Sequence, residues 1–270
     1  MPRARLDGFL MNYEIHEAVL PADTLFIHGN LSSNSWWRPA LDVWRRNARA
    51  GERGRAICAE WRGCGGSGAP TSADQLHPNA LASDYLRLLR HLGVEHGGQR
   101  IHVVGHSTGG LVALYAMSQA PDLFERAVLL DPVSHRGVAF VPAAVEAFRQ
   151  MSDDRAICQA VMATTIKDVD AGSAFFQELV DDAFGAAPLV WTEMPHVLST
   201  IDAREIVQAI QVPTRILHGE FDPILPIAGS AALARRLPHG EFFEIKGRGH
   251  STNVEDPALF AGLVNDHLFN

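Results

Sequence analysis

Cysteine is scarce in this chain of 270 residues, which carries only Cys58, Cys64 and Cys158. An odd number of cysteines excludes a fully paired disulfide framework, and no two of them have the spacing of a metal-binding motif. Cys58 lies within an apolar run, so we expect a buried thiol there. The scarcity suits a reducing compartment, and we expect a cytoplasmic protein that holds no metal ion.

Long hydrophobic runs and an excess of positive charge are also missing. No apolar segment reaches the roughly 18 residues that a transmembrane helix needs, and none follows Met1–Arg5 as it would in a signal peptide. The 23 Lys and Arg residues are outnumbered by 31 Asp and Glu, which gives a net charge of −8. This charge disfavours nucleic acid and anionic membranes as the main partners.

Short apolar runs alternate with helix-length amphipathic segments along most of the chain. The runs expected to be strands are Thr24–His28, Ala56–Trp61, Ile101–Gly105, Ala127–Leu130, Thr214–His218 and Glu241–Lys246. The segments expected to be helices are Trp36–Ala50, Ala80–Leu92, Gly110–Gln119 and Pro257–Phe269. Apolar strands separated by helices indicate an α/β fold, with a mostly parallel sheet and helices on both faces. Residues 8–20 should add an antiparallel edge.

Residues 133–206 interrupt this alternation with helical patterning and no convincing strand. We interpret them as a helical cap inserted into a core formed by residues 1–132 and 207–270. The cap would cover the strand ends, where ligands bind in open α/β sheets. Its apolar content favours a small-molecule substrate with a hydrophobic portion. Most of its large apolar side chains should form the cap's own core and a minority should line a pocket: Phe140, Phe148, Met151, Met162, Phe175, Phe176, Trp191 and Met194.

A G-x-S-x-G sequence at residues 105–109 (GHSTG) lies between an expected strand and an expected helix. This context is that of a nucleophile elbow, in which the serine occupies a strained turn. The flanking Gly105 and Gly109 are needed because side chains there would collide with neighbouring backbone. The alternative is that Ser107 merely caps the helix, but the strand and the two glycines favour a nucleophile.

Together with several other motifs, this turn gives the chain a motif order that resembles that of the α/β-hydrolase superfamily. The motifs are His28-Gly29-Asn30, Trp61-Arg62-Gly63-Cys64-Gly65, the Ser107 turn, Gly219-Glu220-Phe221-Asp222-Pro223 and Gly249-His250. Trp61 departs from the family, where an Asp often precedes Arg-Gly, and this change should affect packing more than chemistry. The resemblance implies the α/β-hydrolase fold and hydrolysis by an activated serine.

A serine hydroxyl needs a base to accept its proton, and His250 is the best candidate among thirteen histidines. It follows the last expected strand in a glycine-containing loop. Its orienting acid should be Asp222, because the order serine, acid, histidine is that of the superfamily. Asp131 remains an alternative, since some members place the acid after the strand that follows the elbow, and Glu220 is a weaker one.

The resemblance further suggests that the backbone N–H groups of Asn30 and Thr108 form the oxyanion hole. His28 and His106 flank the site and are expected to shape it, and His196 in the cap is a candidate for substrate contact. The glycines at 63, 65 and 68 spell G-x-G-x-x-G, but a dinucleotide fingerprint must open a helix directly. Residues 69–72 (APTS) follow instead, so we expect a loop and no cofactor.

The leading hypothesis is therefore hydrolysis of an ester, lactone or related acyl bond through an acyl-enzyme on Ser107. The His28-Gly29-Asn30 start resembles, among others, acyl-homoserine lactone hydrolases, whereas haloalkane dehalogenases need an Asp in place of Ser107. A lyase or a cofactor-free oxygenase on the same fold is a second hypothesis. A non-catalytic small-molecule receptor is a third, because fold alone does not fix function.

Overall fold

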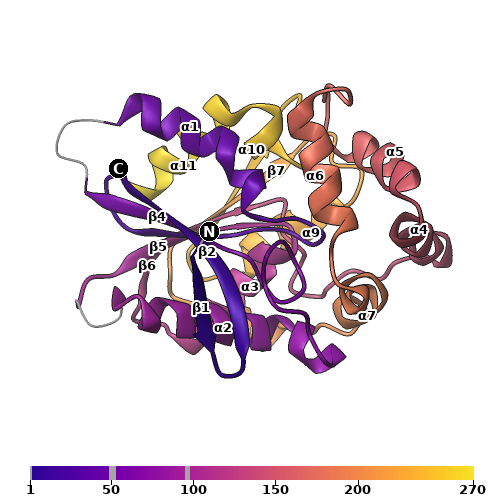
Figure 1. The fold of residues 1–270 in the computed structure, drawn as a ribbon. Helices are drawn as coiled ribbons and strands as arrows, with labels where there is room; N and C mark the ends of the chain where they lie inside the picture. Colours follow the sequence, from indigo (N-terminus) through magenta and orange to yellow (C-terminus); the bar gives the residue numbers. More distant parts are fainter. Residues whose placement is uncertain (1, 49–52, 95–97) are drawn as a thin grey trace.

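The computed structural model describes residues 2–48, 53–94 and 98–270 (Figure 1). Within these residues an eight-stranded sheet has the order β1-β2-β4-β3-β5-β6-β7-β8. The strands are β1 (Arg3–Leu6), β2 (Phe9–Leu20), β3 (Thr24–Ile27), β4 (Gly54–Ala59), β5 (Ile101–His106), β6 (Phe124–Leu130), β7 (Thr214–Gly219) and β8 (Gly240–Ile245). Only the pairings of β2 with β1 and β4 are antiparallel, and the other described pairings are parallel.

This sheet confirms the expected α/β class, the strand set and the antiparallel edge at residues 8–20. The strand ends differ from the expected ones by up to three residues, the largest difference being the start of β6 at Phe124. Phe124 is fully buried although two polar residues separate it from the apolar run that defined the expected strand. Its burial explains why the strand begins earlier than the apolar run alone suggests.

Side chains of the parallel strands alternate between two apolar cores, as the pleat of a β-strand requires. In β3, for example, Leu25 and Ile27 join the core on one face of the sheet, and Phe26 joins the core on the other. The first core also takes side chains of helices α2 (Pro78–His91), α3 (Thr108–Gln119) and α9 (Ile227–Arg236), and the second those of α1 (Arg38–Asn47) and α11 (Pro257–Leu268). Burial on both faces explains the apolar runs of the inner strands β3 to β7, whereas the edge strand β8 leaves Phe242 and Phe243 exposed. Cys58 of β4 is fully buried and free, as expected.

The helices that flank the sheet are α1 (Arg38–Asn47), α2 (Pro78–His91), α3 (Thr108–Gln119), α9 (Ile227–Arg236), α10 (Thr252–Glu255) and α11 (Pro257–Leu268). A 3-10 turn, η1 (Asn34–Trp37), precedes α1, and another, η2 (Ala73–Leu76), precedes α2. The first helix was expected to span Trp36–Ala50, but α1 ends at Asn47 and residues 49–50 lie outside the described residues. None of the described helices is long and apolar enough to span a membrane.

The expected cap segment, residues 133–206, is described throughout and contains helices and no strand. Its helices are α4 (Pro142–Asp153), α5 (Arg155–Thr165), α6 (Ala174–Phe184), α7 (Pro188–Ser199) and the start of α8 (Arg204–Ala209). Helices α4 to α7 gather at one end of the molecule (Figure 1). In contrast, α8 packs against α3 and α9 beside the sheet.

Close approach between α3 and β3 depends on a glycine at the first turn of the helix. A Cβ atom added to Gly109 would lie 2.2 Å from the carbonyl oxygen of Ile27 and 2.4 Å from that of His28. Both contacts are to backbone, which cannot move aside as a flexible side chain could. Gly109 therefore sets how near the helix that follows Ser107 can come to the sheet.

We expect Gly109→Ala to lower the free energy of unfolding by about 2 kcal/mol or more, because the clash with backbone atoms can be relieved only by moving the helix or the strand. Gly262→Ala is the matched control, since nothing lies within 4 Å of an added Cβ in the middle of α11. The control should gain up to about 1 kcal/mol from the better helix propensity of alanine. Urea unfolding of both variants measures the difference, and equal stabilities would contradict this account of the packing.

Candidate active site

Ser107 lies in a turn between β5 and α3 with φ 54° and ψ −121°, in a region of backbone space that a non-glycine residue rarely occupies. Its N–H donates to the carbonyl of Leu130 at 2.9 Å. Its own carbonyl accepts from the N–H groups of Gly110 (3.0 Å) and Val133 (3.1 Å). These three backbone hydrogen bonds hold a conformation that costs on the order of 1–3 kcal/mol.

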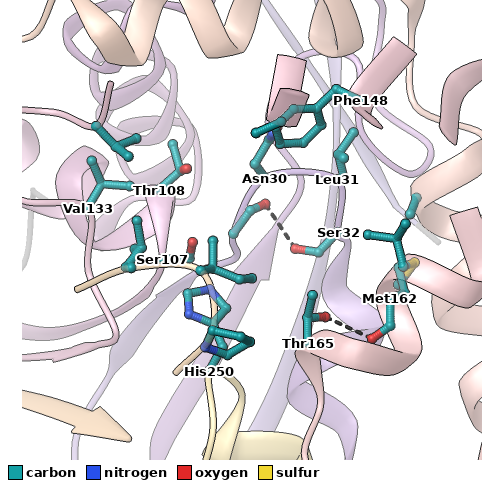
Figure 2. A pocket seen from close by; sticks show the side chains of 18 of the residues that line it. Asn30, Leu31, Ser32, Ser107, Thr108, Val133, Phe148, Met162, Thr165 and His250 are labelled. Carbon is teal, nitrogen blue, oxygen red and sulfur yellow. Dashed lines mark hydrogen bonds between the residues drawn. The ribbon is translucent and has the colours of Figure 1, made fainter. Parts of the chain in front are cut away.

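Glycines make room around this turn, as expected. A Cβ on Gly105 would lie 2.6 Å from the carbonyl oxygen of Gly109, and one on Gly29 would lie 3.1 Å from the Cβ of Ser107. The side chain of Ser107 is thereby left at the carboxyl edge of the sheet. There it lines a cavity together with His250 (Figure 2).

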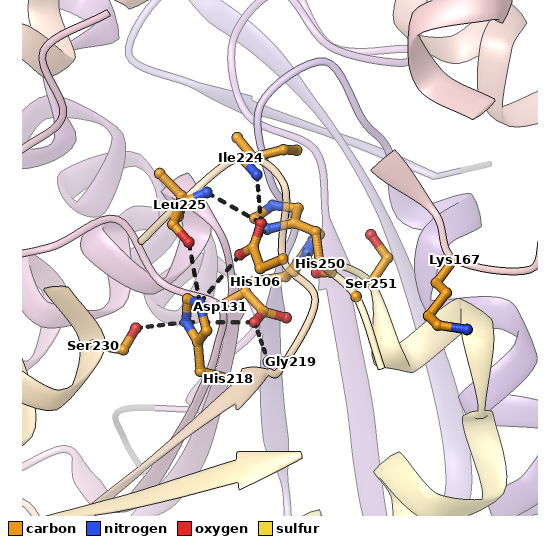
Figure 3. A network of polar contacts seen from close by, with 12 residues as sticks. His106, Asp131, Lys167, His218, Gly219, Ile224, Leu225, Ser230, His250 and Ser251 are labelled. Atoms are coloured by element: carbon orange, nitrogen blue, oxygen red, sulfur yellow. Dashed lines mark hydrogen bonds and ion pairs between the residues drawn. The ribbon is translucent and has the colours of Figure 1, made fainter. Parts of the chain in front are cut away.

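His250 lies in the loop between β8 and α10, where its Nδ1 is 2.7 Å from Oδ2 of Asp222. The Asp222 side chain is 1% exposed. Its Oδ1 accepts the N–H groups of Ile224 (2.7 Å) and Leu225 (3.1 Å), the two residues labelled beside His250 in Figure 3. Burial alone would favour the protonated acid. The adjacent His250 and these hydrogen bonds outweigh burial and lower the pKa of Asp222. The carboxylate is therefore charged and directed at the imidazole.

The loop that carries His250 is anchored at several points. The carboxylate of Glu255 accepts the N–H groups of Gly249 (2.7 Å), Ser251 (3.1 Å) and, from the segment between α5 and α6, Lys167 (3.1 Å). Nε2 of His106 donates to the carbonyl of His250 at 2.9 Å. The position of the imidazole is thus fixed by its backbone as well as by Asp222.

The alternative acid, Asp131, is fully buried one strand away and makes no hydrogen bond to His250 among the described contacts. Its Oδ1 accepts the N–H of Gly219 at 2.8 Å. Burial, reinforced by the charge of Asp222, raises the pKa of Asp131 well above its usual value, which favours a neutral carboxyl. The weaker candidate, Glu220, instead accepts the N–H of Gly247 at 2.9 Å. Of the three acids, only Asp222 makes a described hydrogen bond to the imidazole of His250.

His218, at the end of β7, lies between the two aspartates and was not singled out from the sequence. Its Nε2 is 3.2 Å from the carbonyl oxygen of Leu225 and 3.4 Å from Oδ2 of Asp222. Its Nδ1 is 2.8 Å from the hydroxyl of Ser230 and 3.5 Å from Asp131. Burial lowers the pKa of His218, so a neutral ring donates through Nε2 and accepts the Ser230 hydroxyl at Nδ1. The available sequence signal was a histidine that directly follows the apolar pair Ile216 and Leu217 near the end of the strand.

Two triplets of side chains bring possible metal ligands within 4.8 Å of one another: His106, Asp131 and His250, and Asp131, His218 and Asp222. Most of their nitrogen atoms are already committed to the hydrogen bonds described above. Asp131, which both triplets share, favours its neutral form. A metal ion would have to displace this network, so these residues fit proton chemistry better than metal binding.

Asn30 and Thr108, the expected oxyanion donors, both line the cavity beside Ser107 (Figure 2). Thr108 is the first residue of α3, so its N–H has no acceptor within the helix. The turn that carries Asn30 is held by His28, whose Nδ1 donates to the carbonyl of Gly29 at 2.8 Å and whose Nε2 accepts the N–H of Trp61 at 3.3 Å.

Burial keeps both flanking histidines neutral. Complete burial lowers the pKa of His28 to about 4, and burial together with the nearby His250 lowers that of His106 to about 3. The ring of His106 also stacks on Trp36, with 5.8 Å between the ring centroids. Both residues bind backbone groups of the site, which agrees with the shaping role expected for them.

The glycine-rich loop at residues 63–68 wraps around Glu60, a second buried group that sequence reasoning missed. Its Oε2 accepts the N–H of Gly66 (2.7 Å) and the amide of Asn12 (2.8 Å), and its Oε1 faces the N–H of Asn34 at 3.3 Å. The carboxylate of Glu60 thus occupies the backbone N–H of Gly66, which a bound phosphate would otherwise need. The loop leads to η2 and α2 rather than directly into a helix, which supports the expectation that it binds no dinucleotide.

The cavity has a volume of about 360 Å³. Within the described part of the chain, no Lys, Arg, Asp or Glu lines it. Four of the eight large apolar residues of 133–206 do so, namely Phe140, Phe148, Met151 and Met162, while Phe176 and Met194 are fully buried away from it. His196 is exposed and does not line the cavity, so the expected substrate contact is not formed.

Comparison with known proteins identifies the family. The model of the alpha/beta hydrolase family matches residues 24–263, and the chain belongs to that family. A relative from Pseudomonas savastanoi pv. phaseolicola, named "Putative carbamate hydrolase RutD", is 28% identical over 268 residues, covering 96% of this chain and 98% of the relative.

Solved structures show the same fold at lower identity. The enol-lactonase from Burkholderia xenovorans LB400 superposes with a TM-score of 0.83 at 22% identity, with 100% of both chains covered. A bromoperoxidase from Bacillus anthracis gives a TM-score of 0.83 at 23% identity, covering 97% of this chain and 96% of that one. Because differently named activities share this fold, the chemistry has to be argued from the site.

The neutral state of His28 predicts an acid-sensitive fold. The unfolded chain binds a proton at this ring below pH 6.5, whereas the folded chain does so only near its lowered pKa. The stabilisation is therefore complete above pH 6.5 and is lost as the pH falls towards 4, by about 2 kcal/mol at pH 5.

Urea unfolding at pH 7.5 and pH 5.0 measures this loss in the wild type and in His28→Asn, whose amide can replace the Nδ1 donor. The variant should lose about 2 kcal/mol less between the two pH values, because asparagine does not titrate. An identical loss in both proteins would show that His28 does not contribute to the acid sensitivity.

Proposed function

We propose that this protein is a serine hydrolase that cleaves an ester, lactone or related acyl bond through an acyl-enzyme on Ser107. The observation that carries the proposal is the hydrogen-bonded pair of His250 and Asp222 beside a serine in a strained strand-to-helix turn, with the serine and the histidine open to one cavity. This constellation is defined by geometry and recurs on unrelated folds.

In the proposed mechanism, Oγ of Ser107 attacks the acyl carbon while Nε2 of His250 accepts its proton. Asp222 holds the proton on Nδ1 and stabilises the imidazolium. The N–H groups of Asn30 and Thr108 would stabilise the oxyanion. His250 then protonates the leaving oxygen or nitrogen, which departs and leaves the acyl-enzyme. Water, deprotonated by His250, releases the acid and restores Ser107.

The cavity favours an uncharged, apolar substrate. Burying an ionised group without a partner carries a heavy desolvation penalty, and the described cavity lining offers no lysine or arginine to offset it. A neutral carbamate ester would satisfy this restriction, as would an alkyl ester or a lactone. An ionised carbamate would not, although relatives are named for carbamate hydrolysis. We therefore place carboxylic ester or lactone hydrolysis first.

We also propose that residues 133–206 act as the cap of this site. They supply four of the large apolar side chains that line the cavity, as described above. They also reach the loop before α1, because Asp182 of α6 accepts the hydroxyl of Ser33 at 2.5 Å. Substrate selectivity would then be set largely by helices α4, α5 and α6.

Hydrolysis of p-nitrophenyl esters from acetate to decanoate tests the nucleophile. Ser107→Ala should lower kcat/KM by at least about 10³-fold, because no other group replaces the nucleophile, while the wild type should show a burst of p-nitrophenol. Ser118→Ala is the matched control, since Ser118 is exposed on the same helix and its loss should leave activity unchanged. Ester turnover that survives Ser107→Ala would show that Ser107 is not the nucleophile, and no ester turnover by the wild type would favour a lyase, an oxygenase or a receptor.

The two aspartates give a second test with its own control. Asp222→Asn should lower kcat by about 10²- to 10⁴-fold, because an amide cannot hold the proton on Nδ1 or stabilise the imidazolium. Asp131→Asn should change kcat less than about threefold, since asparagine resembles the neutral carboxyl and keeps the acceptor for Gly219. Steady-state kinetics of both variants decides, and the opposite ranking would assign the orienting role to Asp131.

A further inference from the structure

A second cavity, of about 410 Å³, adjoins the catalytic cavity. Five residues line both spaces, so the two cavities meet at these side chains: Val138, Phe140, Ala144, Ile224 and Leu225. The remaining lining comes from residues 132–141 and from the loop and first turn that lead into α9. We call this space the outer cavity, and the catalytic mechanism proposed above makes no use of it.

The outer cavity is uncharged and apolar. Its lining, which lies wholly within the described residues, contains no acidic or basic side chain. Two of its apolar residues are unusually open to solvent, with Val141 64% and Ile224 39% exposed. Exposed apolar side chains around a hollow indicate a surface that an apolar ligand covers.

We propose that the outer cavity is a binding subsite for the leaving portion of the substrate, a hydrophobic alcohol that extends from the catalytic cavity past the side chains that line both spaces. This inference rests on the proposed hydrolase function and deepens it.

The position of Ile224 and Leu225, which line both cavities, indicates that the outer cavity takes the leaving alcohol rather than the acyl group. Ile224 and Leu225 donate their N–H groups to Asp222, which in turn holds His250. Because His250 protonates the leaving oxygen, the leaving group must lie next to the imidazole. The oxyanion donors, Asn30 and Thr108, lie on another loop and on α3. An alcohol chain that continues beyond the imidazole therefore meets Ile224 and Leu225, which line both cavities.

Gly229 offers a way to fill the outer cavity without touching the catalytic one. It lies in the first turn of α9 and lines only the outer cavity. A Cβ added there would be 3.4 Å from the Cβ of Ser134, another outer-cavity residue, at ordinary contact distance. A larger side chain can therefore enter the cavity, and replacing a helical glycine also favours the helix.

The experiment compares two ester series with the wild type, Gly229→Ala and Gly229→Met. The first series is methyl to octyl butyrate, which lengthens the alcohol, and the second is methyl acetate to methyl octanoate, which lengthens the acyl group. Gly262→Met is the matched control, because Gly262 has open space around it in α11.

In the wild type, kcat/KM should rise with alcohol length by up to about fourfold per methylene that enters the subsite. Gly229→Met should lower kcat/KM for octyl butyrate by at least about tenfold. It should stay within about twofold of the wild type on methyl butyrate and throughout the acyl series. Gly229→Ala should retain most of the octyl preference, and Gly262→Met should match the wild type on every ester.

Each of the other outcomes contradicts a defined part of the argument. Unchanged activity of Gly229→Met on octyl butyrate would overturn the subsite, and a loss that follows acyl length would overturn its assignment to the alcohol. A wild type without Ser107-dependent turnover of methyl butyrate would refute the proposed hydrolase function itself, and the subsite proposal with it.

Discussion

The left-handed backbone at Ser107 is the constraint around which the site is arranged. It lets a strand end and a helix begin without any loop between them, so the serine stands at the edge of the sheet. The turn is possible because the neighbouring glycines allow backbone segments to touch. Parallel strands then bring the loops after β3, β6, β7 and β8 to the same edge. Asn30, Asp131, Asp222 and His250 lie at that edge because each follows a strand that runs in the same direction.

Near the serine, two buried aspartates follow the adjacent strands β6 and β7, and their pKa values shift in opposite directions. Asp222 receives two backbone N–H groups and the imidazole of His250, and its pKa falls. Burial of Asp131, reinforced by the charge of Asp222, outweighs the single N–H group that it accepts, and its pKa rises. His218 separates them and contacts both. The arrangement places a single negative charge next to the imidazole and avoids the repulsion that two buried carboxylates would produce.

The sequence was sufficient for the fold because burial on both sheet faces leaves a short apolar run in each inner parallel strand, β3 to β7. It was also sufficient to place Ser107, since the elbow needs a recognisable glycine pattern. It left Asp222 and Asp131 as alternatives because both simply follow strands, and only coordinates reveal which of them contacts His250. His218 and Glu60 were missed because a polar residue within a strand-end pattern carries no motif.

The pocket lining within residues 133–206 could not be predicted for a different reason. The helices of this segment pack on one another and on η1, η2 and α3, so apolar periodicity marks buried faces without saying what each face meets. Phe148 and Phe176 have similar sequence environments, yet one lines the cavity and the other is buried in the packing.

The hydrogen bonds of the Glu255 carboxylate are divided unequally between the loop that carries His250 and the segment between α5 and α6. The carboxylate holds two N–H groups of the His250 loop but only one, that of Lys167, from the segment next to α5 and α6. If that segment lifts to exchange substrate for product, one hydrogen bond breaks and the two on the catalytic loop remain. The imidazole would stay in register with Asp222 throughout opening and closing. Turnover would then require no reassembly of the reactive groups after each product departs.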